Sequence, residues 1–437
     1  MIGIVVSRAD EASTHIGEFL YELADWEVTE DRTVDPGAGG GTVRHTNRFE
    51  LRTFDGLHID LVGAADPFSN LDGLVFASRH SGETGPLLTA HFTGNPGAAD
   101  FGGEPGQLAR SWPAGLARIL SNLRGTAPDG YEVGIECTHH GPTDLEVPSM
   151  FVEVGSSETQ WRDPEAAEAV ARAILSLDAQ EPVDRTIVGF GGGHYAPRFE
   201  RISRETDWAV GHILADWGLD AIAGDRQPVL EQAFDRSGAT RAVIDGDRPR
   251  LAVEVDSLGY RVVSETWVRE TQSVPLELVD DLEGRLSSVD DGLRFGDRVA
   301  DVDRVSIYDP PSDLLDDLHG IDPGATRRAV VAQTVAFETA ENGNRIQGRI
   351  ALPAEESQSA FIEALVRVLE TKYDAVEWFD DTLLVRERAF DPDRARELGV
   401  PEGPLFGQLS SGEPVEVGGE TITPEMVHTE RERRYRL

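Results

Sequence analysis

The stretch SMFVEVGSSETQWRDPEAAEAVARAILSL (Ser149–Leu177) decides the fold. Its first seven residues form an apolar run that ends at Gly155, and such a run is typical of a buried strand. Residues 163–177 instead carry apolar side chains at helical spacing, with Asp163 as the N-cap and Pro164 in the first turn. A buried strand that leads into a well-capped helix predicts an α/β domain.

The same alternation continues on both sides of this stretch. Apolar runs predict strands at residues 2–7, 48–54, 57–63, 73–80, 86–95, 131–136, 240–246 and 250–255, and one that begins at residue 185. Helical spacing predicts helices at residues 10–26, 106–125, 208–214 and 228–234. Over about 260 residues this pattern predicts an α/β fold with a central mixed sheet flanked by helices.

The composition changes near residue 268, where Asp-rich and Pro-rich segments begin. A hairpin around residues 341–344, a helix, two strands and a Gly-punctuated end follow. We therefore expect two domains, residues 1–268 and an additional acidic α+β C-terminal domain of residues 269–437.

Charge is the strongest compositional signal, because 79 acidic residues face 40 basic ones and leave a net charge of −39. Regular apolar periodicity argues against disorder, so the composition indicates a haloarchaeal protein adapted to molar salt. Molar salt screens the repulsion between an acidic protein and the phosphates of a nucleic acid. The lack of a basic patch is therefore only weak evidence against nucleic-acid binding. No apolar run is long enough to span a membrane, and the N-terminus does not read as a signal peptide. The single cysteine permits no internal disulfide, which fits a cytoplasmic protein.

Histidines and carboxylates follow several predicted strands. They form four clusters, which contain His80 and His91; Glu136, Cys137, His139 and His140; Glu153 and Glu158; and His194, Tyr195 and Arg198. Because carboxyl ends of strands form the ligand crevice of an open α/β sheet, we expect these clusters to converge there.

The residue spacing leaves the chemistry of these clusters open. A metal site is one interpretation, but no His-x-x-x-His or Cys-x-x-Cys motif supports it, and a structural role is equally compatible with His91. Adjacent side chains of an extended segment diverge, so we expect only one of His139 and His140 to face a shared pocket, unless the turn at Gly141-Pro142 rotates the second. Cys137 is either a nucleophile or buried packing. Glu153 and Glu158 are either a surface pair, or one of them is a general base.

The Gly-rich stretch GFGGGHY (189–195) is not a dinucleotide-binding loop, because a histidine stands where the last glycine of that motif belongs. Its three consecutive glycines allow close approach of a ligand and offer backbone N–H donors for an anion. A plain flexible turn is the alternative interpretation.

Three segments in the same order, residues 78–95, 138–166 and 189–214, resemble the archaeal and plant D-aminoacyl-tRNA deacylases. The resemblance implies a fold similar to peptidyl-tRNA hydrolase and nucleoside phosphorylase, and hydrolysis of the ester that joins a D-amino acid to tRNA. It also implies zinc, one or two ions per chain, and the CCA end of D-aminoacyl-tRNA as the partner. A rival mechanism has no metal, and the ribose 2′-hydroxyl then positions the water.

The resemblance assigns roles to residues of this chain. It implies catalytic roles for His139, His140, His194 and Glu136, and zinc ligation by His80, His139 and His194. It implies substrate binding by Gly191, Gly192, Gly193, Tyr195, Arg198, Thr143 and Arg79. We expect a monomer without membrane contact. The alternative function is a phosphorylase-type protein that binds a nucleoside or phosphate ligand without deacylase activity.

The chain departs from this family by its length beyond residue 268. Residues 390–417 are similar to the tail of ribonuclease Z-type proteins, where such a segment lies near the substrate path. The C-terminal domain therefore either helps to hold tRNA or only adds folded acidic surface.

Overall fold

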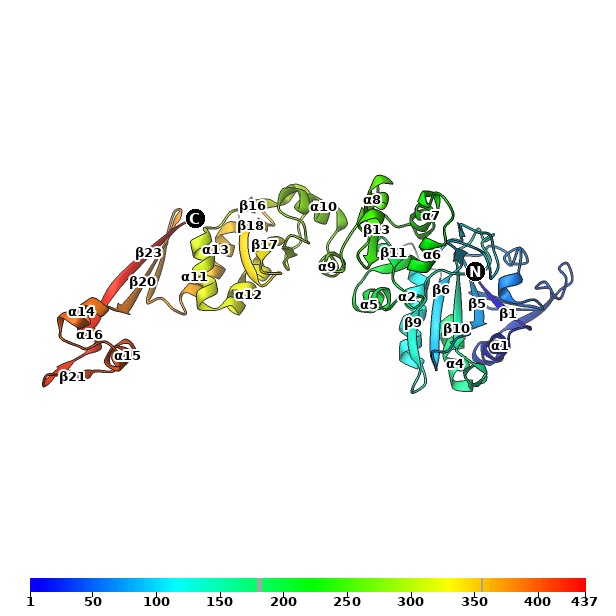
Figure 1. Ribbon diagram of the computed structural model, residues 1–437, viewed down its shortest axis with the longest axis horizontal. Coiled ribbons are helices and arrows are strands. Elements are labelled where there is room, and N and C mark those ends of the chain that lie inside the picture. The colour runs from blue at the N-terminus through cyan, green and yellow to red at the C-terminus, as the bar shows by residue number, and fades with distance from the viewer. Residues whose placement is uncertain (179–182, 355–356) are drawn as a thin grey trace. The chain divides into compact units, whose positions relative to one another are not determined.

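The computed structural model describes residues 1–178, 183–354 and 357–437. The chain divides into two compact units, Met1–Gln272 and Ser273–Leu437 (Figure 1). The boundary between them lies four residues after the predicted position, 268. None of the helices in the described parts of the chain is long and apolar enough to cross a membrane.

An eight-stranded mixed sheet forms the centre of the first unit, as predicted. Its strand order is β2-β3-β4-β1-β5-β10-β6-β9. The bounds are β1 (Ile2–Ser7), β2 (Glu27–Asp31), β3 (Gly41–His45), β4 (Phe49–Phe54), β5 (Gly73–Arg79), β6 (Leu87–Phe92), β9 (Glu132–Ile135) and β10 (Ser149–Gly155). Strand β5 runs parallel to β10, whereas β6 runs antiparallel to β10 and parallel to β9. Strands β5 and β9 therefore point in opposite directions.

A second sheet in the same unit is entirely parallel, with the order β12-β11-β13-β14. Its strands are β11 (Thr186–Gly191), β12 (Ala209–Leu214), β13 (Arg241–Asp245) and β14 (Arg261–Val262). The unit also contains the short strands β7 (Gly94–Asn95) and β8 (Gln107–Leu108). Its helices are α1 (Glu11–Leu23), α2 (Pro113–Thr126), α3 (Glu158–Trp161), α4 (Pro164–Leu175), α5 (Pro197–Glu205), α6 (Asp216–Asp220), α7 (Gln227–Ser237), α8 (Pro249–Ser257) and α9 (Glu265–Glu270).

Three predicted elements are wrong. Residues 57–63 contain a 3-10 turn (His58–Asp60) and no strand. Residues 208–214 form strand β12, because a strand buried on both faces of a parallel sheet is apolar throughout and hides its period of two. Residues 250–255 lie in helix α8, where Pro249 starts the first turn and Leu251 and Val255 face the core together.

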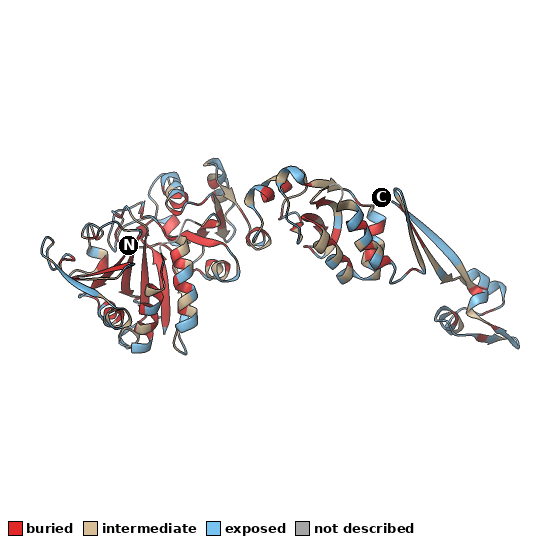
Figure 2. Ribbon diagram, turned by 180° about the vertical axis from the view of Figure 1, so that it is seen from behind, coloured by how far each residue is buried: buried red, intermediate tan, exposed pale blue. Residues whose placement is uncertain are grey.

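The second unit has the α+β composition that the sequence predicts. Its main sheet, β15-β17-β18-β16, packs with helices around one apolar core. The bounds are β15 (Leu293–Phe295), β16 (Ser306–Tyr308), β17 (Ala336–Ala340), β18 (Arg345–Leu352), α10 (Leu276–Arg285), α11 (Ser312–Ile321), α12 (Pro323–Gln333) and α13 (Ser357–Leu369). Figure 2 shows buried residues concentrated in the strands of the first unit and in this core.

A smaller sheet, β19-β20-β23, completes the second unit. It consists of β19 (Ala375–Phe379), β20 (Thr382–Phe390) and β23 (His428–Arg436). The segment between β20 and β23 forms a second small core from α14 (Pro392–Glu397), α15 (Pro404–Ser410), β21 (Val415–Val417), β22 (Glu420–Ile422) and α16 (Pro424–Val427).

Candidate active site

One face of the large sheet gathers most of the predicted polar clusters. Because paired residues of neighbouring strands share a face, Phe76, Phe151 and His91 form one row across β5, β10 and β6. Ser78, Glu153 and Thr89 form the next row. The clusters therefore meet on one face of the sheet. They do not meet at the carboxyl ends of the strands, because β5 and β9 run in opposite directions and their carboxyl ends lie at opposite ends of the sheet.

Glu136 lies at the centre of this face and is 1% exposed. Its Oε2 accepts a hydrogen bond of 2.8 Å from His194 Nε2, and its Oε1 lies 3.1 Å from His80 Nδ1. Burial acts to raise the pKa of Glu136, but the contacts with His194 and His80 outweigh it and hold the pKa well below its usual range. Glu136 is therefore an ionised carboxylate in a buried position.

His80 lies between two buried carboxylates. Its Nδ1 is 3.6 Å from Glu153 Oε2, and its Nε2 lies 2.8 Å from the Tyr195 hydroxyl. Burial acts to lower the pKa of His80, but Glu136 and Glu153 raise it to about 11. Burial raises the pKa of Glu153, which lies deeper in the sheet. A side chain at position 155 would collide with His80, since an added Cβ would lie 2.7 Å from the His80 Cβ.

Three further histidines, His91, His139 and His140, lie side by side. Their ring centroids are 4.2–4.6 Å apart. The expectation that His139 and His140 diverge is wrong, because residues 137–140 are irregular and not extended, and both rings reach the same space. Burial lowers the pKa of His91 and of His139 to about 3, and it lowers that of His140 well below the usual range, so all three imidazoles are neutral.

Hydrogen bonds fix which nitrogen of these rings is free. His91 Nδ1 donates to the Phe92 carbonyl at 3.0 Å, and His139 Nδ1 donates to the Cys137 carbonyl at 2.8 Å. Both Nε2 atoms therefore present lone pairs. His91 Nε2 and His140 Nδ1 are buried and have no hydrogen-bond partner among the described residues. Unsatisfied buried nitrogens of this kind are costly unless a ligand occupies the space between them.

A cavity of about 390 Å³ opens beside these rings. Its wall is formed by Asp10, Leu57, His58, Ile59, Ser78, Arg79, His80, Ser81, Phe101, His139, His140, Phe151, Glu153 and His194. The wall therefore combines imidazole and carboxylate groups with the apolar side chains of Leu57, Ile59, Phe101 and Phe151.

The second sheet supplies His194. Strand β11 ends at Gly191, where φ is +90°, and the Gly-rich turn carries His194 across to Glu136 of the first sheet. The backbone of Cys137 donates to the His194 carbonyl at 2.8 Å and fixes this crossing. Gly191 and Gly192 face Asp245, and Arg198 Nε lies 3.4 Å from the Asp245 carboxylate.

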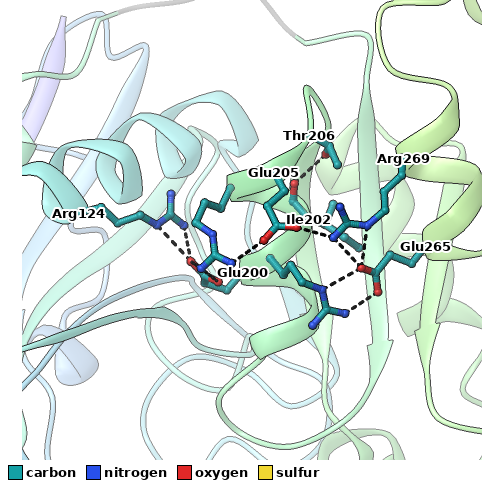
Figure 3. A network of polar contacts seen from close by, with 9 residues as sticks. Arg124, Glu200, Ile202, Glu205, Thr206, Glu265 and Arg269 are labelled. Atoms are coloured by element: carbon teal, nitrogen blue, oxygen red, sulfur yellow. Dashed lines mark hydrogen bonds and ion pairs between the residues drawn. The ribbon is translucent and has the colours of Figure 1, made fainter. Parts of the chain in front are cut away.

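A network of arginine and glutamate side chains anchors helix α5, which begins three residues after His194 (Figure 3). Arg124 of α2 binds Glu200 at 2.8 Å, and Arg269 of α9 binds Glu205 at 2.6 Å and Glu265 at 3.0 Å. These pairs connect α5 to two other helices and so hold the turn that carries His194.

The remaining predicted residues lie in different places. Arg79 lines the cavity, its guanidinium lies over the Trp161 ring, and its backbone N–H donates to Asp10. Tyr195 contacts His80, whereas Thr143 binds the backbone of Glu104 and does not line the cavity. Burial raises the pKa of Cys137 to about 12, which removes the thiolate needed for a nucleophile.

Four groups of side chains bring possible metal-binding atoms within 4.8 Å of one another in the described ranges. They are His91, His139 and His140; Cys137, His139 and His194; His80, Glu136 and His194; and His91, Glu136 and Glu153. None of these groups contains all three predicted ligands: His139 and His194 share one group, and His80 and His194 share another.

Sequence reasoning left several cavity residues out of the site. It weighed Glu153 but assigned it no role, and it missed Asp10, His58 and Phe101. His91, which stacks on the cavity residue Phe151, was likewise weighed and given no role. Asp10 accepts hydrogen bonds from the backbone of Ser13, as the N-cap of α1, and of Arg79. Its N-cap position was visible in the sequence, but its place beside the cavity depends on the pairing of β1 with β5.

The fold and the site define an α/β enzyme with a histidine and carboxylate centre. A family model for D-aminoacyl-tRNA deacylase matches residues 68–263. The D-aminoacyl-tRNA deacylases of Haloarcula marismortui and Natronomonas pharaonis are both 52% identical to this chain, over 452 and 439 aligned residues that cover 100% of each chain. The crystal structure of a conserved protein of unknown function, AF0625, matches with a TM-score of 0.57 and 30% identity, over 63% of this chain and 99% of that one.

The chain therefore belongs to the D-aminoacyl-tRNA deacylase family, and it is a hydrolase with this activity. The resemblance seen in the sequence is confirmed. The two haloarchaeal relatives align over their whole length, so they share the C-terminal unit.

Proposed function

We propose that the cavity on the large sheet is where the ester of D-aminoacyl-tRNA is hydrolysed. The observation that carries this proposal is the 2.8 Å bond between Glu136 and His194, at the wall of a cavity that four other histidines also line. An imidazole oriented by a buried carboxylate is the arrangement that removes a proton from water at neutral pH.

In this proposal His194 is the general base and Glu136 orients it. His194 takes a proton from water as the water oxygen attacks the ester carbonyl. It then returns the proton to the ribose oxygen as the carbon–oxygen bond breaks. His80 holds a positive charge at the cavity wall, where it stabilises the negative charge that develops on the carbonyl oxygen. Tyr195 and Glu153 keep the His80 ring in place.

The residues present fit a zinc ion. Neutral imidazoles are zinc ligands, and His91 and His140 each have a buried nitrogen without a hydrogen-bond partner in the described ranges. We propose that His91, His139 and His140 hold the ion, in place of the set that the sequence suggested. The backbone bonds at His91 Nδ1 and His139 Nδ1 orient these two ligands. Bound zinc supplies Lewis acidity.

The D-aminoacyl group is proposed to occupy the cavity itself. The apolar Leu57, Ile59 and Phe101 face its side chain, and a volume of about 390 Å³ accommodates side chains of many sizes. Asp10 offers a carboxylate suited to the α-ammonium group, and Glu153 lies in the same wall as a hydrogen-bonding group. Gly191–Gly193 and Arg198 lie at the carboxyl edge of the second sheet, where they fit the terminal nucleotides of the CCA end.

We further propose that residues 1–268 form the deacylase domain and that the reaction takes place in the cytoplasm, where aminoacyl-tRNA is made and used.

Deacylation of D-tyrosyl-tRNA and L-tyrosyl-tRNA in molar KCl tests this function. We expect the D-ester to be cleaved at least about a hundredfold faster than the L-ester, since a shaped pocket rejects the wrong isomer by clashes. A strong chelator should abolish the activity, and added zinc should restore it. Equal cleavage of both isomers would refute the assignment of the pocket, and full activity in the chelator would refute the zinc proposal.

A further inference from the structure

Strands β20 and β23 form an arginine-rich ribbon, which we define as residues 382–390 and 428–436. It contains six arginines and three glutamates, a net charge of +3 in a chain whose net charge is −39. The arginines are Arg386, Arg388, Arg431, Arg433, Arg434 and Arg436. A positive segment is unusual in a protein whose surface is otherwise dominated by carboxylates.

The two faces of the ribbon differ. Leu383, Val385 and Tyr435 share one face and are buried in the apolar core of the second unit. The register places Arg386, Arg388, Arg434 and Arg436 on the opposite face, together with Glu430 and Glu432. The side chains of Arg434 and Arg436 are 70% and 88% exposed. Figure 2 shows the strand β23 as largely exposed. This outer face therefore presents guanidinium groups to solvent along its length.

Arg386 is held by Glu377 at 2.7 Å and by Glu432 at 2.8 Å, but the other three arginines of the outer face are less firmly paired than those of the first unit. Arg434 and Arg436 each lie 3.4 Å from one exposed carboxylate, and Arg388 has no ion pair with any described residue. In contrast, Arg201, Arg124 and Arg269 bind carboxylates at 2.6–2.8 Å in the network around α5 (Figure 3). Exposed pairs of this kind contribute little to stability, so structural need does not explain the arginines of the outer face.

We infer that the outer face of the ribbon binds the sugar-phosphate backbone of the tRNA substrate. This inference rests on the D-aminoacyl-tRNA deacylase activity, which supplies a polyanionic substrate. In molar salt the Debye length is only about 3 Å, so neither steering nor repulsion acts at a distance. Only direct contacts then contribute to binding, and the planar guanidinium of arginine makes bidentate hydrogen bonds to phosphate. Residues two apart on a strand are separated by about 6.8 Å, similar to the spacing of neighbouring phosphates on one RNA strand.

The test uses the full-length chain and two variants of equal charge change. One variant carries Arg388→Gln, Arg434→Gln and Arg436→Gln. The matched control carries Arg48→Gln, Arg118→Gln and Arg172→Gln, three exposed arginines of the first unit that lie outside the cavity. For each protein, we would measure the dissociation constant for uncharged tRNA, and KM and kcat for D-tyrosyl-tRNA and for the minimal ester D-tyrosyl-adenosine. Circular dichroism confirms folding at every KCl concentration.

We expect the ribbon variant to bind tRNA about tenfold more weakly at the lowest KCl concentration that keeps the protein folded, with the difference narrowing as KCl rises. KM for D-tyrosyl-tRNA should rise in parallel, while hydrolysis of D-tyrosyl-adenosine stays at the wild-type rate. Unchanged tRNA binding, an equal loss in the control variant, or an equal loss with the minimal ester would each overturn the inference. Wild-type protein that fails to cleave the minimal ester or D-tyrosyl-tRNA would instead refute the proposed active site.

Discussion

The two units of the chain treat ionisable side chains in opposite ways. The first unit buries Asp10, Glu50, Arg52, His58, His80, His91, Glu136, Glu153 and His212. In the second unit Arg294 is the only Asp, Glu, His, Arg or Lys side chain that is buried among the described residues. Its core is built from leucine, isoleucine, valine and aromatic side chains.

This difference indicates where the chemistry lies. Taking a charge out of water costs several kcal/mol unless the protein compensates for it, so a fold carries many such groups only where they have a use. The first unit compensates through mutual contacts around Glu136, whereas the second unit avoids the cost and keeps its charges at the surface. Substitutions of the buried groups of the first unit, measured against matched changes elsewhere in the chain, test this contrast.

Glu136→Gln removes the central charge of the first unit while keeping its shape. We expect kcat for D-tyrosyl-tRNA to fall by about a thousandfold, because His194 loses the carboxylate that orients it. Glu132→Gln on strand β9, which ends immediately before Glu136, is the matched control, since Glu132 is exposed. Single-turnover deacylation measures both variants. A loss of less than tenfold in Glu136→Gln would show that the buried carboxylate is not part of the catalytic machinery.

His212→Ala tests whether burial of a histidine in the first unit has a structural use as well. His212 Nε2 donates to the Ala109 carbonyl at 2.8 Å, and its Nδ1 accepts from the Thr138 hydroxyl at 2.9 Å. Loss of the imidazole leaves a cavity and removes the partner of the Ala109 carbonyl and of the Thr138 hydroxyl. We expect the free energy of unfolding to fall by about 2–4 kcal/mol. The corresponding change in the second unit, His319→Ala, removes one bond to the Ile346 N–H and should cost about 1 kcal/mol.

The difference in the free energy of unfolding between the wild type and His212→Ala should depend on pH, and its direction can be derived. Burial lowers the pKa of His212 to about 4, from an ordinary value of 6.5. As pH falls from 6.5 to 4, the unfolded wild-type chain takes up a proton at His212 that the folded chain does not. The free energy of unfolding of the wild type therefore falls with pH, whereas that of His212→Ala lacks this contribution. The difference in free energy of unfolding between the two proteins should narrow as pH falls. Urea titrations at pH 7 and pH 5 measure it, and a constant gap would contradict the burial of a neutral imidazole.

Cys137→Ala should have the smallest effect. The thiol is buried and its raised pKa removes it from nucleophilic chemistry, so we expect kcat to change by less than about threefold. Iodoacetamide should likewise leave the folded wild type active. A large fall in kcat of Cys137→Ala, or rapid inactivation of the wild type by iodoacetamide, would indicate that Cys137 takes part in the reaction.

Much of the fold could be predicted because local patterns were clear. The strand and helix at 149–177 and the change of composition near residue 268 follow from apolar periodicity and from capping residues. Strand β12 was missed because full burial on both faces removes the alternation that marks a strand. Helix α8 was missed because six of its residues, taken alone, resemble an apolar strand.

The sequence indicated which histidines belong to the candidate site, but it did not indicate how they lie relative to one another. The histidine clusters were visible, yet their meeting place depends on the register between β5, β10 and β6, strands that are distant in sequence. That register places His91 and Glu153 on the active face, and no local pattern shows it. The irregular backbone at residues 137–140, which turns both His139 and His140 into the cavity, is likewise set by contacts with the second sheet at Ile213 and His212.

Metal content and activity measured together on three proteins test the central claim most directly. The wild type, His91→Ala and His194→Ala should be purified in molar KCl with zinc, dialysed, and assayed for bound metal and for D-tyrosyl-tRNA hydrolysis, with His45→Ala as the surface control. We predict that His91→Ala loses both metal and activity, that His194→Ala keeps the metal and loses activity, and that His45→Ala keeps both. A metal-free His91→Ala protein with wild-type activity would contradict the account.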